Sequence, residues 1–431
     1  MVQSKWLLGA VSVVGLAAAC SSDANTGKPI TAQAGSGGAS AGSGSSGAPA
    51  GGTSGASGGA PASGGGGASG GGAPATCTPA CSADQACVGG TCRPKPVELT
   101  SVAGCGQMHL AVSKGTLYFT DFAHGNVKSV PVAGGAVADV ATGQKAPYAV
   151  AVDDAGVVYW STSSSTVQAD NTLMMKAPAN AATKVADVKQ PTDAAKTNVA
   201  RYITVGGSFL YYGAGDDLLK VEAKAAATPL KLGTFDGQPT AIVLSPPLPA
   251  ATTRIFTTLG LDNAVQWRAP DPAASGCTDP VTRPLPKSGE SAGEATARIN
   301  GGGCAFSESV GNLMFDTLNL AGTSIVFADG TSIQVADTTV ASTTQATRTQ
   351  VVETESFDPI SGFTNTATTV YFGESTTGII EKATLPKGDP VILVNDPVQI
   401  SPSAFVNDGT NLYWHTGASA ADACTIYKLA L

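Results

Sequence analysis

Gly115-Thr116-Leu117-Tyr118-Phe119-Thr120-Asp121 is the stretch that decides the fold, and Gly125-Asn126-Val127-Lys128-Ser129-Val130-Pro131-Val132-Ala133-Gly134-Gly135 follows it. The first segment predicts a β-strand that ends on an aromatic pair, because aromatic and branched residues favour strands. The second predicts another strand that closes on a glycine turn. Related segments recur down the chain, so we expect a repeat protein.

The recurring feature is a short strand that ends on an aromatic or large apolar pair. Steps of 41 to 52 residues separate most copies, and one step is about 71 residues. The seven copies are Leu117-Tyr118-Phe119, Val158-Tyr159-Trp160, Leu210-Tyr211-Tyr212, Arg254-Ile255-Phe256, Ile325-Val326-Phe327, Val370-Tyr371-Phe372 and Leu412-Tyr413-Trp414.

Each unit also carries further short strand candidates on either side of the aromatic strand. In the second unit these are Ala149–Val152 before it, then Leu173–Lys176 and Lys184–Ala186 after it. Four short strands at this period are typical of the blades of a β-propeller. The sequence therefore predicts an all-β fold of four-stranded blades.

The first unit resembles the YWTD-type blade of six-bladed β-propellers, through Leu117-Tyr118-Phe119-Thr120-Asp121 and Val130-Pro131-Val132-Ala133-Gly134-Gly135. The likeness covers roughly Pro96 to Leu431. Only the first copy keeps Thr-Asp after the aromatic pair; the other copies have Ser161-Thr162, Gly213, Thr257-Thr258, Ala328-Asp329, Gly373-Glu374 and His415-Thr416. The resemblance implies the fold and not the ligand chemistry of that family.

The number of blades depends on how the ring closes. The last unit ends after its third strand, so its outermost strand has to come from elsewhere, and Val97–Val102 is the obvious donor. Such closure removes exposed strand edges. We expect seven blades, or six if Arg254-Ile255-Phe256 or Ile325-Val326-Phe327 belongs to an insertion.

Nine cysteines suit an exported protein with disulfides, because eight of them lie beyond the N-terminal leader. In the propeller region we expect a disulfide between Cys277 and Cys304, which would close a loop within the step of about 71 residues. We expect Cys105–Cys424 to staple the first unit to the last.

The N-terminus has the layout of an export signal: Lys5, an apolar run from Trp6, then small residues before Cys20. Leu16-Ala17-Ala18-Ala19-Cys20 resembles a bacterial lipobox, which implies a signal peptide over 1–19 and a lipid on Cys20. By the same resemblance, Ser21 implies an outer-membrane location, on its periplasmic or its outer face. The alternative is ordinary cleavage at the same bond, which leaves Cys20 free.

Residues 20–76 are mostly Gly, Ser and Ala, a composition that predicts a disordered tether. Residues 77–95 then hold Cys77, Cys81, Cys87 and Cys92, which predict a small module stapled by disulfides. A Cys₄ zinc site is the rival interpretation, although zinc ribbons favour closely spaced cysteine pairs. The propeller is expected to fill 96–431.

Composition argues against a nucleic-acid partner, since the net charge is −8 with no Lys/Arg-rich block. Only three histidines are present. We expect His109 to be structural, within an inner strand. We expect His124 and His415 to lie at turns in the first and last units, which a closed ring brings together.

Neither histidine is completed by a cysteine or carboxylate cluster, so we expect no catalytic residues, metal or other cofactor. Ligands of propellers bind over the central channel, on the face formed by loops after the second and fourth strands. The candidate binding rim on that face comprises Asp121, His124, Asn126, Asp170, Asp216, Glu374 and His415.

The leading hypothesis is a monomeric, non-enzymatic propeller that binds a protein or glycan and is held at a membrane by its lipid. One alternative is an exported hydrolase or lyase with its site at the channel mouth. The other is a structural component of the cell envelope.

Overall fold

The computed structural model describes residues 77–163, 171–188, 199–235, 238–245, 254–259, 264–269, 304–307, 313–339, 347–354, 358–396, 399, 401–417 and 423–431. All described residues belong to one compact unit, which spans Gly70–Leu431. The predicted leader, Cys20 and the tether therefore lie outside the described residues. Within the part described, there is no α-helix, and no helix that could cross a membrane.

The cysteine-rich segment forms a small hairpin of β1 (Gln85–Val88) and β2 (Thr91–Pro94). Its two-residue turn is Gly89-Gly90, both at positive φ, a conformation that glycine adopts without steric cost. Cys77 pairs with Cys87, and Cys81 pairs with Cys92. The four sulfurs of this segment are therefore joined in two disulfides.

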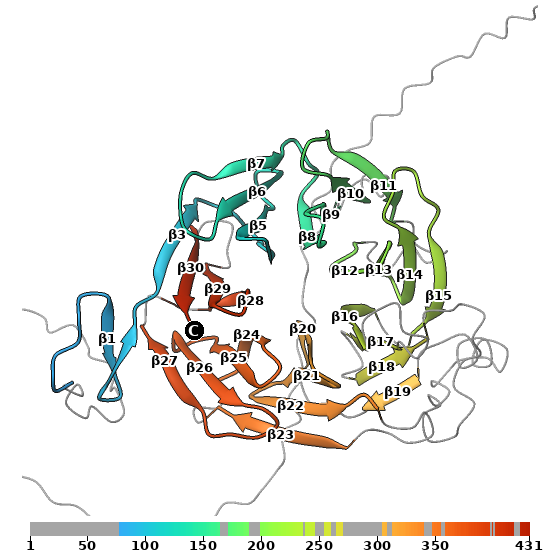
Figure 1. Cartoon of the computed structure of the whole chain (residues 1–431). Helices are drawn as coiled ribbons and strands as arrows, with labels where there is room; N and C mark the ends of the chain where they lie inside the picture. The colour runs from blue at the N-terminus through green and yellow to red at the C-terminus, as the bar shows by residue number, and fades with distance from the viewer. Residues whose placement is uncertain are drawn as a thin grey trace, which may run out of the picture. The chain divides into compact units, whose positions relative to one another are not determined.

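The rest of the unit is a ring of seven antiparallel four-stranded sheets around a central channel (Figure 1), which is a β-propeller. We number the blades in chain order. Blade 1 is β4 (Leu110–Ser113), β5 (Thr116–Asp121), β6 (Asn126–Pro131) and β7 (Ala138–Ala141). Blade 2 is β8 (Pro147–Val152), β9 (Val158–Thr162), β10 (Thr172–Lys176) and β11 (Thr183–Asp187). Blade 3 is β12 (Ile203–Gly206), β13 (Phe209–Ala214), β14 (Asp217–Glu222) and β15 (Leu230–Thr234).

The next three blades follow the same order. Blade 4 is β16 (Pro239–Ser245), β17 (Arg254–Leu259), β18 (Ala264–Arg268) and β19 (Cys304–Ser307). Blade 5 is β20 (Leu313–Ala321), β21 (Ser324–Asp329), β22 (Ser332–Asp337) and β23 (Arg348–Glu353). Blade 6 is β24 (Ile360–Asn365), β25 (Thr369–Glu374), β26 (Ile379–Thr384) and β27 (Val391–Asn395).

Blade 7 closes the ring with strands from both ends of the propeller. It consists of β28 (Ser403–Asn407), β29 (Asn411–Thr416), β30 (Cys424–Ala430) and, as its outermost strand, β3 (Val97–Val102). β3 pairs antiparallel with β30, from Val97 opposite Lys428 to Val102 opposite Cys424. The predicted N-terminal closing strand is thus confirmed, and so are seven blades.

The seven predicted aromatic strands are all second strands of blades, namely β5, β9, β13, β17, β21, β25 and β29. Their large side chains are buried. One aromatic side chain in each second strand is 0% exposed, namely Phe119, Trp160, Tyr212, Phe256, Phe327, Phe372 and Trp414. Core clusters join residues of neighbouring blades, such as Tyr212 of blade 3 with Tyr159 of blade 2. The aromatic ends therefore pack blade against blade and are not open stacking surfaces.

Candidate site at the mouth of the central channel

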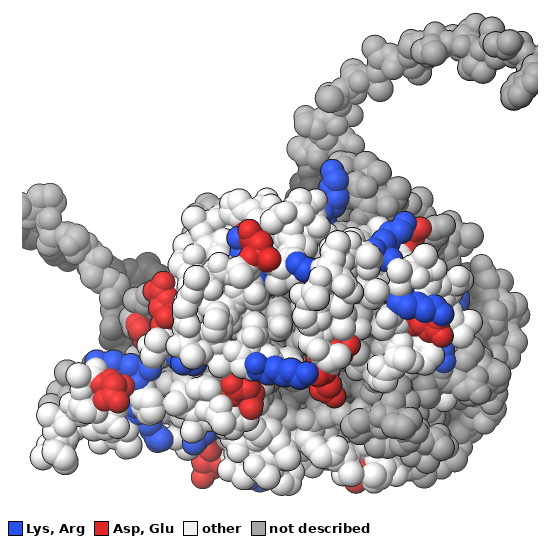
Figure 2. Space-filling view, turned by 45° about the horizontal axis from the view of Figure 1, so that its top comes forward, with Lys and Arg blue, Asp and Glu red and all other residues white. Residues whose placement is uncertain are grey.

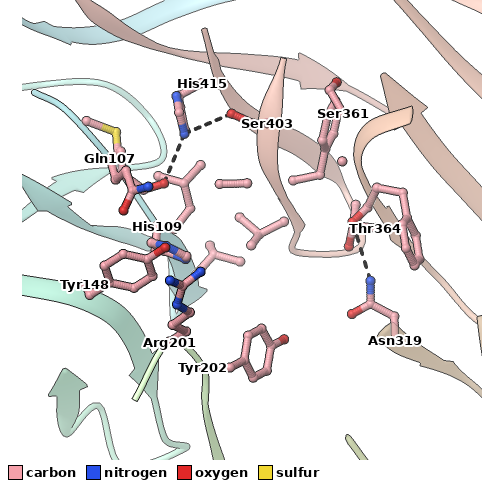
Figure 3. A pocket seen from close by; sticks show the side chains of 18 of the residues that line it. Gln107, His109, Tyr148, Arg201, Tyr202, Asn319, Ser361, Thr364, Ser403 and His415 are labelled. Atoms are coloured by element: carbon pink, nitrogen blue, oxygen red, sulfur yellow. Dashed lines mark hydrogen bonds between the residues drawn. The ribbon is translucent and has the colours of Figure 1, made fainter. Parts of the chain in front are cut away.

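A cavity of about 730 Å³ lies in the central channel (Figure 3). Its walls come from the inner strands of blades 1, 2, 5, 6 and 7 and from Arg201 and Tyr202, which directly precede the inner strand of blade 3. The size falls in the usual range for sites that hold a small ligand.

One end of this cavity is defined by the path of the chain. In an antiparallel sheet the start of the first strand and the end of the second strand lie at the same end. His109 directly precedes β4, Tyr148 lies near the start of β8, and His415 lies near the end of β29. We call these three residues, with Arg201, the mouth cluster. It lies on the face formed by the loops after the second and fourth strands.

His415 occupies the repeat position that directly follows the aromatic pair. In other blades that position holds a small residue, such as Thr120, Ser161 or Gly373. Thr120 Oγ1 donates to the Tyr148 carbonyl oxygen of the next blade at 2.9 Å. His415 makes the equivalent link between blades 7 and 1, since its Nε2 lies 3.0 Å from the Met108 carbonyl oxygen.

That link fixes the tautomer of His415. A carbonyl oxygen only accepts, so Nε2 carries the hydrogen and donates it to Met108. Ser403 Oγ also lies 3.2 Å from Nε2, which gives a serine–histidine pair inside the cavity. Because Nε2 is the protonated nitrogen, it is not the base that would remove a proton from Ser403.

His109 packs beside Tyr148, with ring centroids 4.7 Å apart. Burial, followed by the nearby His415 and Arg201, lowers the pKa of His109 to about 4. Burial likewise lowers the pKa of His415 to about 4. Both imidazoles are therefore neutral at pH 7, and Figure 3 shows the Arg201 guanidinium next to His109.

The other polar groups of the cavity are uncharged. They are Gln107, Asn319, Ser361, Thr364, Ser403 and Asn407, along with Tyr148 and Tyr202. Among the described residues that line the cavity, Arg201 is the one residue charged at pH 7, and no carboxylate is present. The wall is thus rich in hydrogen-bonding groups and carries a single positive charge.

The structure separates most of the predicted rim residues from this cavity. Asp121 is 1% exposed and accepts a 2.7 Å hydrogen bond from Nδ1 of the half-exposed His124. Glu374 is 4% exposed and accepts a bond from Thr377 Oγ1 at 2.6 Å. Asn126 begins β6 opposite Asp121. The Asp121 and Glu374 side chains thus hold the turns in which they lie.

One further described rim residue, Asp216, is not among the residues that line the cavity. Asp216 lies in the turn between β13 and β14, and its carbonyl accepts from Phe235 N. Asp170 lies outside the described residues. Among the rim candidates that the structure describes, His415 alone lines the cavity, where it is 4% exposed and is accompanied by His109 and not by His124. Blades 7 and 1 adjoin through His415 and Met108, as a closed ring requires, while the predicted proximity of His124 to His415 stays a prediction.

The disulfide predicted at the closing seam is present next to the mouth. Cys105 and Cys424 are bonded, with Cα atoms 5.8 Å apart, and both are fully buried. The bond joins blade 7 to the segment that leads into His109. The other expected disulfide, between Cys277 and Cys304, cannot be assessed because Cys277 lies outside the described residues.

Side chains that can bind a metal ion, those of His, Cys, Asp and Glu, are scattered over the described part of the chain. Within that part, the one group of His, Cys, Asp or Glu close enough to share an ion is Cys77, Cys81 and Cys92, and these sulfurs are disulfide-bonded. Among the described residues, no such group of metal ligands lies around the mouth cluster.

Sequence reasoning missed Arg201 and Ser403. Arg201 lies outside any strand, in a stretch without periodicity, and Ser403 is an ordinary residue at the start of an inner strand. One signal was available for His415: aligning the seven units shows an imidazole where the other blades have Thr, Ser, Gly or Ala.

Known proteins resemble this chain in fold alone. No family model matches the sequence, and a search of curated proteins finds no match. A crystal structure of a catalytically inactive variant of virginiamycin B lyase from Staphylococcus aureus with quinupristin is similar at 14% identity and a TM-score of 0.52. The match covers 78% of this chain and 98% of that one.

Two further propeller-like structures match at comparable level. YCF48 bound to D1 peptide has 8% identity and a TM-score of 0.51, over 78% of this chain and 95% of that one. The WD40 β-propeller domain of Doa1 has 9% identity and a TM-score of 0.52, over 77% and 96%. At these identities the likeness establishes the β-propeller fold and nothing finer.

Proposed function

We propose that this protein is a non-enzymatic binding propeller that receives part of a ligand in the mouth of its central channel. The observation that carries the proposal is the 730 Å³ cavity among the inner strands, lined by neutral hydrogen-bonding groups and one arginine. Such a concave wall with a few convergent polar groups is the usual form of a binding site. We further propose that the chain is exported and held at a membrane by a lipid on Cys20, as its sequence predicts.

The distribution of charged side chains on the viewed face supports recognition at a local site and not along an extended surface of one charge. Figure 2 shows Lys and Arg interspersed with Asp and Glu over the viewed face, with large uncharged areas between them. A partner bound through a broad field would call for charges of one sign gathered together. We therefore place specificity in the channel mouth.

Hydrolysis is the second candidate, and the specific observation in its favour is the 3.2 Å contact between Ser403 Oγ and His415 Nε2. It is the weaker one for two reasons. His415 donates Nε2–H to Met108, and its equivalent in blade 1, Thr120, makes a purely structural bond of the same kind. A serine nucleophile would require His415 in the other tautomer.

The binding proposal is tested by blocking the mouth. Gln107 is exposed and lines the cavity, so Gln107→Trp fills the mouth without disturbing the core. The matched control is Gln350→Trp on the exposed outer strand β23. The full chain and both variants are applied to arrays of peptides and of glycans. We expect probes that bind the parent to lose at least about tenfold affinity for Gln107→Trp and to bind the control normally.

Equal binding by all three proteins would place the site elsewhere. The membrane anchor has a separate test, the intact mass of the protein from the membrane fraction. We expect added lipid mass on a chain that begins at Cys20, and the bare mass of that chain would refute the anchor.

A further inference from the structure

One wall of the channel mouth is the segment Gly106–His109, which lies between two fixed points. Before it, Cys105 is bonded to Cys424, and after it β4 begins at Leu110. Gly106 has φ 71°, a conformation that glycine adopts without steric cost. We call Gly106–His109 the mouth segment. Because the disulfide joins its start to blade 7, this segment can change conformation without opening the ring.

Hydrogen bonds to two neighbouring strands hold the mouth segment in place. Across the seam between blades 7 and 1, the Met108 carbonyl oxygen accepts from His415 Nε2 at 3.0 Å. Within blade 1, the His109 N–H donates to Thr120 Oγ1 at 3.0 Å, and the His109 carbonyl oxygen accepts from Thr120 N at 3.2 Å. The imidazole of His415 therefore ties strand β29 of blade 7 to the mouth segment.

The surroundings of His415 suit a neutral ring. His415 is buried, and within the described residues its second ring nitrogen, Nδ1, has no hydrogen-bond partner. A protonated ring carries a hydrogen on both nitrogens. Burial lowers the pKa of His415 to about 4, although the carbonyl groups of Met108, Thr416 and Gly417 favour the charged form. The charged ring is therefore disfavoured in the closed mouth.

His109, on the mouth segment itself, is disfavoured as a cation for similar reasons. Burial, followed by the nearby His415 and Arg201, lowers the pKa of His109 to about 4. A positive charge on one histidine opposes a positive charge on the other. The two imidazoles thus come from opposite sides of the seam, and the closed mouth holds both of them neutral.

Among the described residues, the elements packed around the two histidines bring no carboxylate to the cavity. The other titratable groups that line it are Tyr148, Tyr202 and Arg201. Strand β28 has no charged residue. Strand β30 carries Lys428, whose Nζ donates to the Val132 carbonyl oxygen at 2.9 Å.

Two carboxylates in adjoining turns are engaged elsewhere. Asp121 accepts from His124 Nδ1 at 2.7 Å. Asp358, which lies shortly before β24, accepts from Ser375 Oγ at 2.9 Å and from Thr376 N at 2.8 Å. Positive charges on His109 and His415 are therefore better accommodated in water than in the closed mouth.

We infer that the channel mouth is an acid-sensitive switch, in which protonation of His109 and His415 releases the mouth segment from blade 7 and weakens ligand binding in the cavity. Both rings then reach water, while Cys105–Cys424 and the pairing of β3 with β30 keep the ring closed. The inference rests on the proposed binding function and adds regulation to the same site. The response of the mouth segment can be measured without a ligand.

Amide hydrogen exchange of the full chain at pH 7 and at about pH 5 tests the switch, since ordinary carboxylates are still mostly ionised at the lower pH. The open mouth binds more protons than the closed one, so acid favours it. Protection of the mouth segment, corrected for the intrinsic exchange rate at each pH, is expected to fall at least about tenfold. Protection in strands away from the mouth, such as β6 and β14, is expected to change little.

The chain has three histidines, and the third supplies a matched control. The double variant His109→Gln/His415→Gln is expected to lose the fall in protection, because glutamine does not titrate. His124→Gln removes a half-exposed imidazole and is expected to keep the fall. If the double variant fails to fold by thermal unfolding, His415→Gln alone carries the test and is expected to show a smaller fall than the parent.

The effect on binding is measured with an array probe whose binding is weakened by Gln107→Trp. Its affinity is expected to drop at least about tenfold between pH 7 and about pH 5 for the parent and for His124→Gln. The double variant is expected to bind it equally at both pH values. An acid response of the mouth segment with unchanged probe affinity would refute the regulatory role.

The outcomes separate this inference from the proposed function. No fall in protection in the parent, or the same fall in the double variant, overturns the switch and leaves channel binding intact. A fall of equal size in β6 and β14 also overturns it, because acid would then loosen the whole propeller. If no array probe binds, the proposed function is refuted, while hydrogen exchange still decides whether the mouth segment responds to acid.

Discussion

At the scale of single residues, one repeat position explains both the structure and the site. The residue after each aromatic pair faces the next blade, which limits its size. A Cβ at Gly373 would lie 2.5 Å from Pro402 Cγ, and one at Gly213 would lie 2.6 Å from the Pro239 carbonyl oxygen. The seam between blades 7 and 1 instead accommodates His415, which brings a polar side chain to the wall of the cavity.

The two mouth histidines predict a specific pH dependence of stability. Their pKa values near 4 in the folded state lie below the 6.5 of an unfolded chain. The unfolded state therefore binds more protons between pH 6.5 and 4, and stability falls as the pH drops through that window. The loss is up to about 3 kcal/mol for each imidazole.

His415→Gln tests this dependence, because glutamine can still donate to Met108 but does not titrate. We expect denaturant unfolding at several pH values to show a flatter fall in the variant than in the parent between pH 6.5 and 4. The same slope in both proteins would show that His415 is not held neutral in the folded state.

A second residue-scale prediction concerns the turn between first and second strands. Asp153 accepts from Val157 N at 2.8 Å and from Tyr159 OH at 3.0 Å, and Asp408 accepts equivalently from Asn411 N and Tyr413 OH at 2.7 Å each. Burial by itself raises the pKa of Asp408, but the hydrogen bonds from Tyr413, Thr410 and Asn411 together outweigh it and hold that pKa below its usual range.

Asp153→Ala is expected to lower the free energy of unfolding by about 1 to 3 kcal/mol, since it leaves two partly buried donors without their acceptor. Asp154→Ala, one residue along and exposed, is the matched control and is expected to change it by less than about 0.5 kcal/mol. Equal effects of the two changes in urea unfolding would refute a special role for Asp153.

At the scale of elements, the sequence predicted the second strands and the closing strand β3 correctly. Aromatic and branched residues mark those strands locally, and the missing fourth strand of the last unit required a donor. The mouth cluster was not predictable in the same way. Which side chains reach the channel depends on contacts between blades, such as His415 with Met108.

Removing β3 tests the closure. A chain that begins at Ala103 leaves the β30 edge of blade 7 unpaired, so we expect it to aggregate or to unfold at lower temperature. A chain that begins at Pro96 keeps β3 and is the control. Size-exclusion chromatography and thermal unfolding are the measurements. Indistinguishable behaviour of the two chains would mean that β3 contributes little to the ring.

At the scale of the whole molecule, two interactions close the ring where its ends meet. They are the pairing of β3 with β30 and the disulfide between Cys105 and Cys424. The disulfide joins residues 319 positions apart, so it restricts nearly the entire propeller in its unfolded state. It also anchors the segment that carries Met108 and His109. Stability and the shape of the channel mouth are therefore coupled at this seam.

The double variant Cys105→Ser/Cys424→Ser is expected to lose about 2 to 5 kcal/mol of unfolding free energy. The matched control, Cys77→Ser/Cys87→Ser, removes a disulfide from the small hairpin and is expected to leave propeller unfolding nearly unchanged. A non-reducing tryptic map of the parent is expected to contain the linked Cys105 and Cys424 peptides. A Cys105–Cys304 peptide would contradict the seam.

The most direct test of a binding site in the channel mouth is amide hydrogen exchange of the full chain, with and without the probe that binds it most tightly on the peptide and glycan arrays. We predict that this probe slows exchange in Gly106–His109 and along β24 and β28, which line the cavity. Slowed exchange confined to outer strands such as β7, β11 and β27, with Gly106–His109 unchanged, would contradict the account.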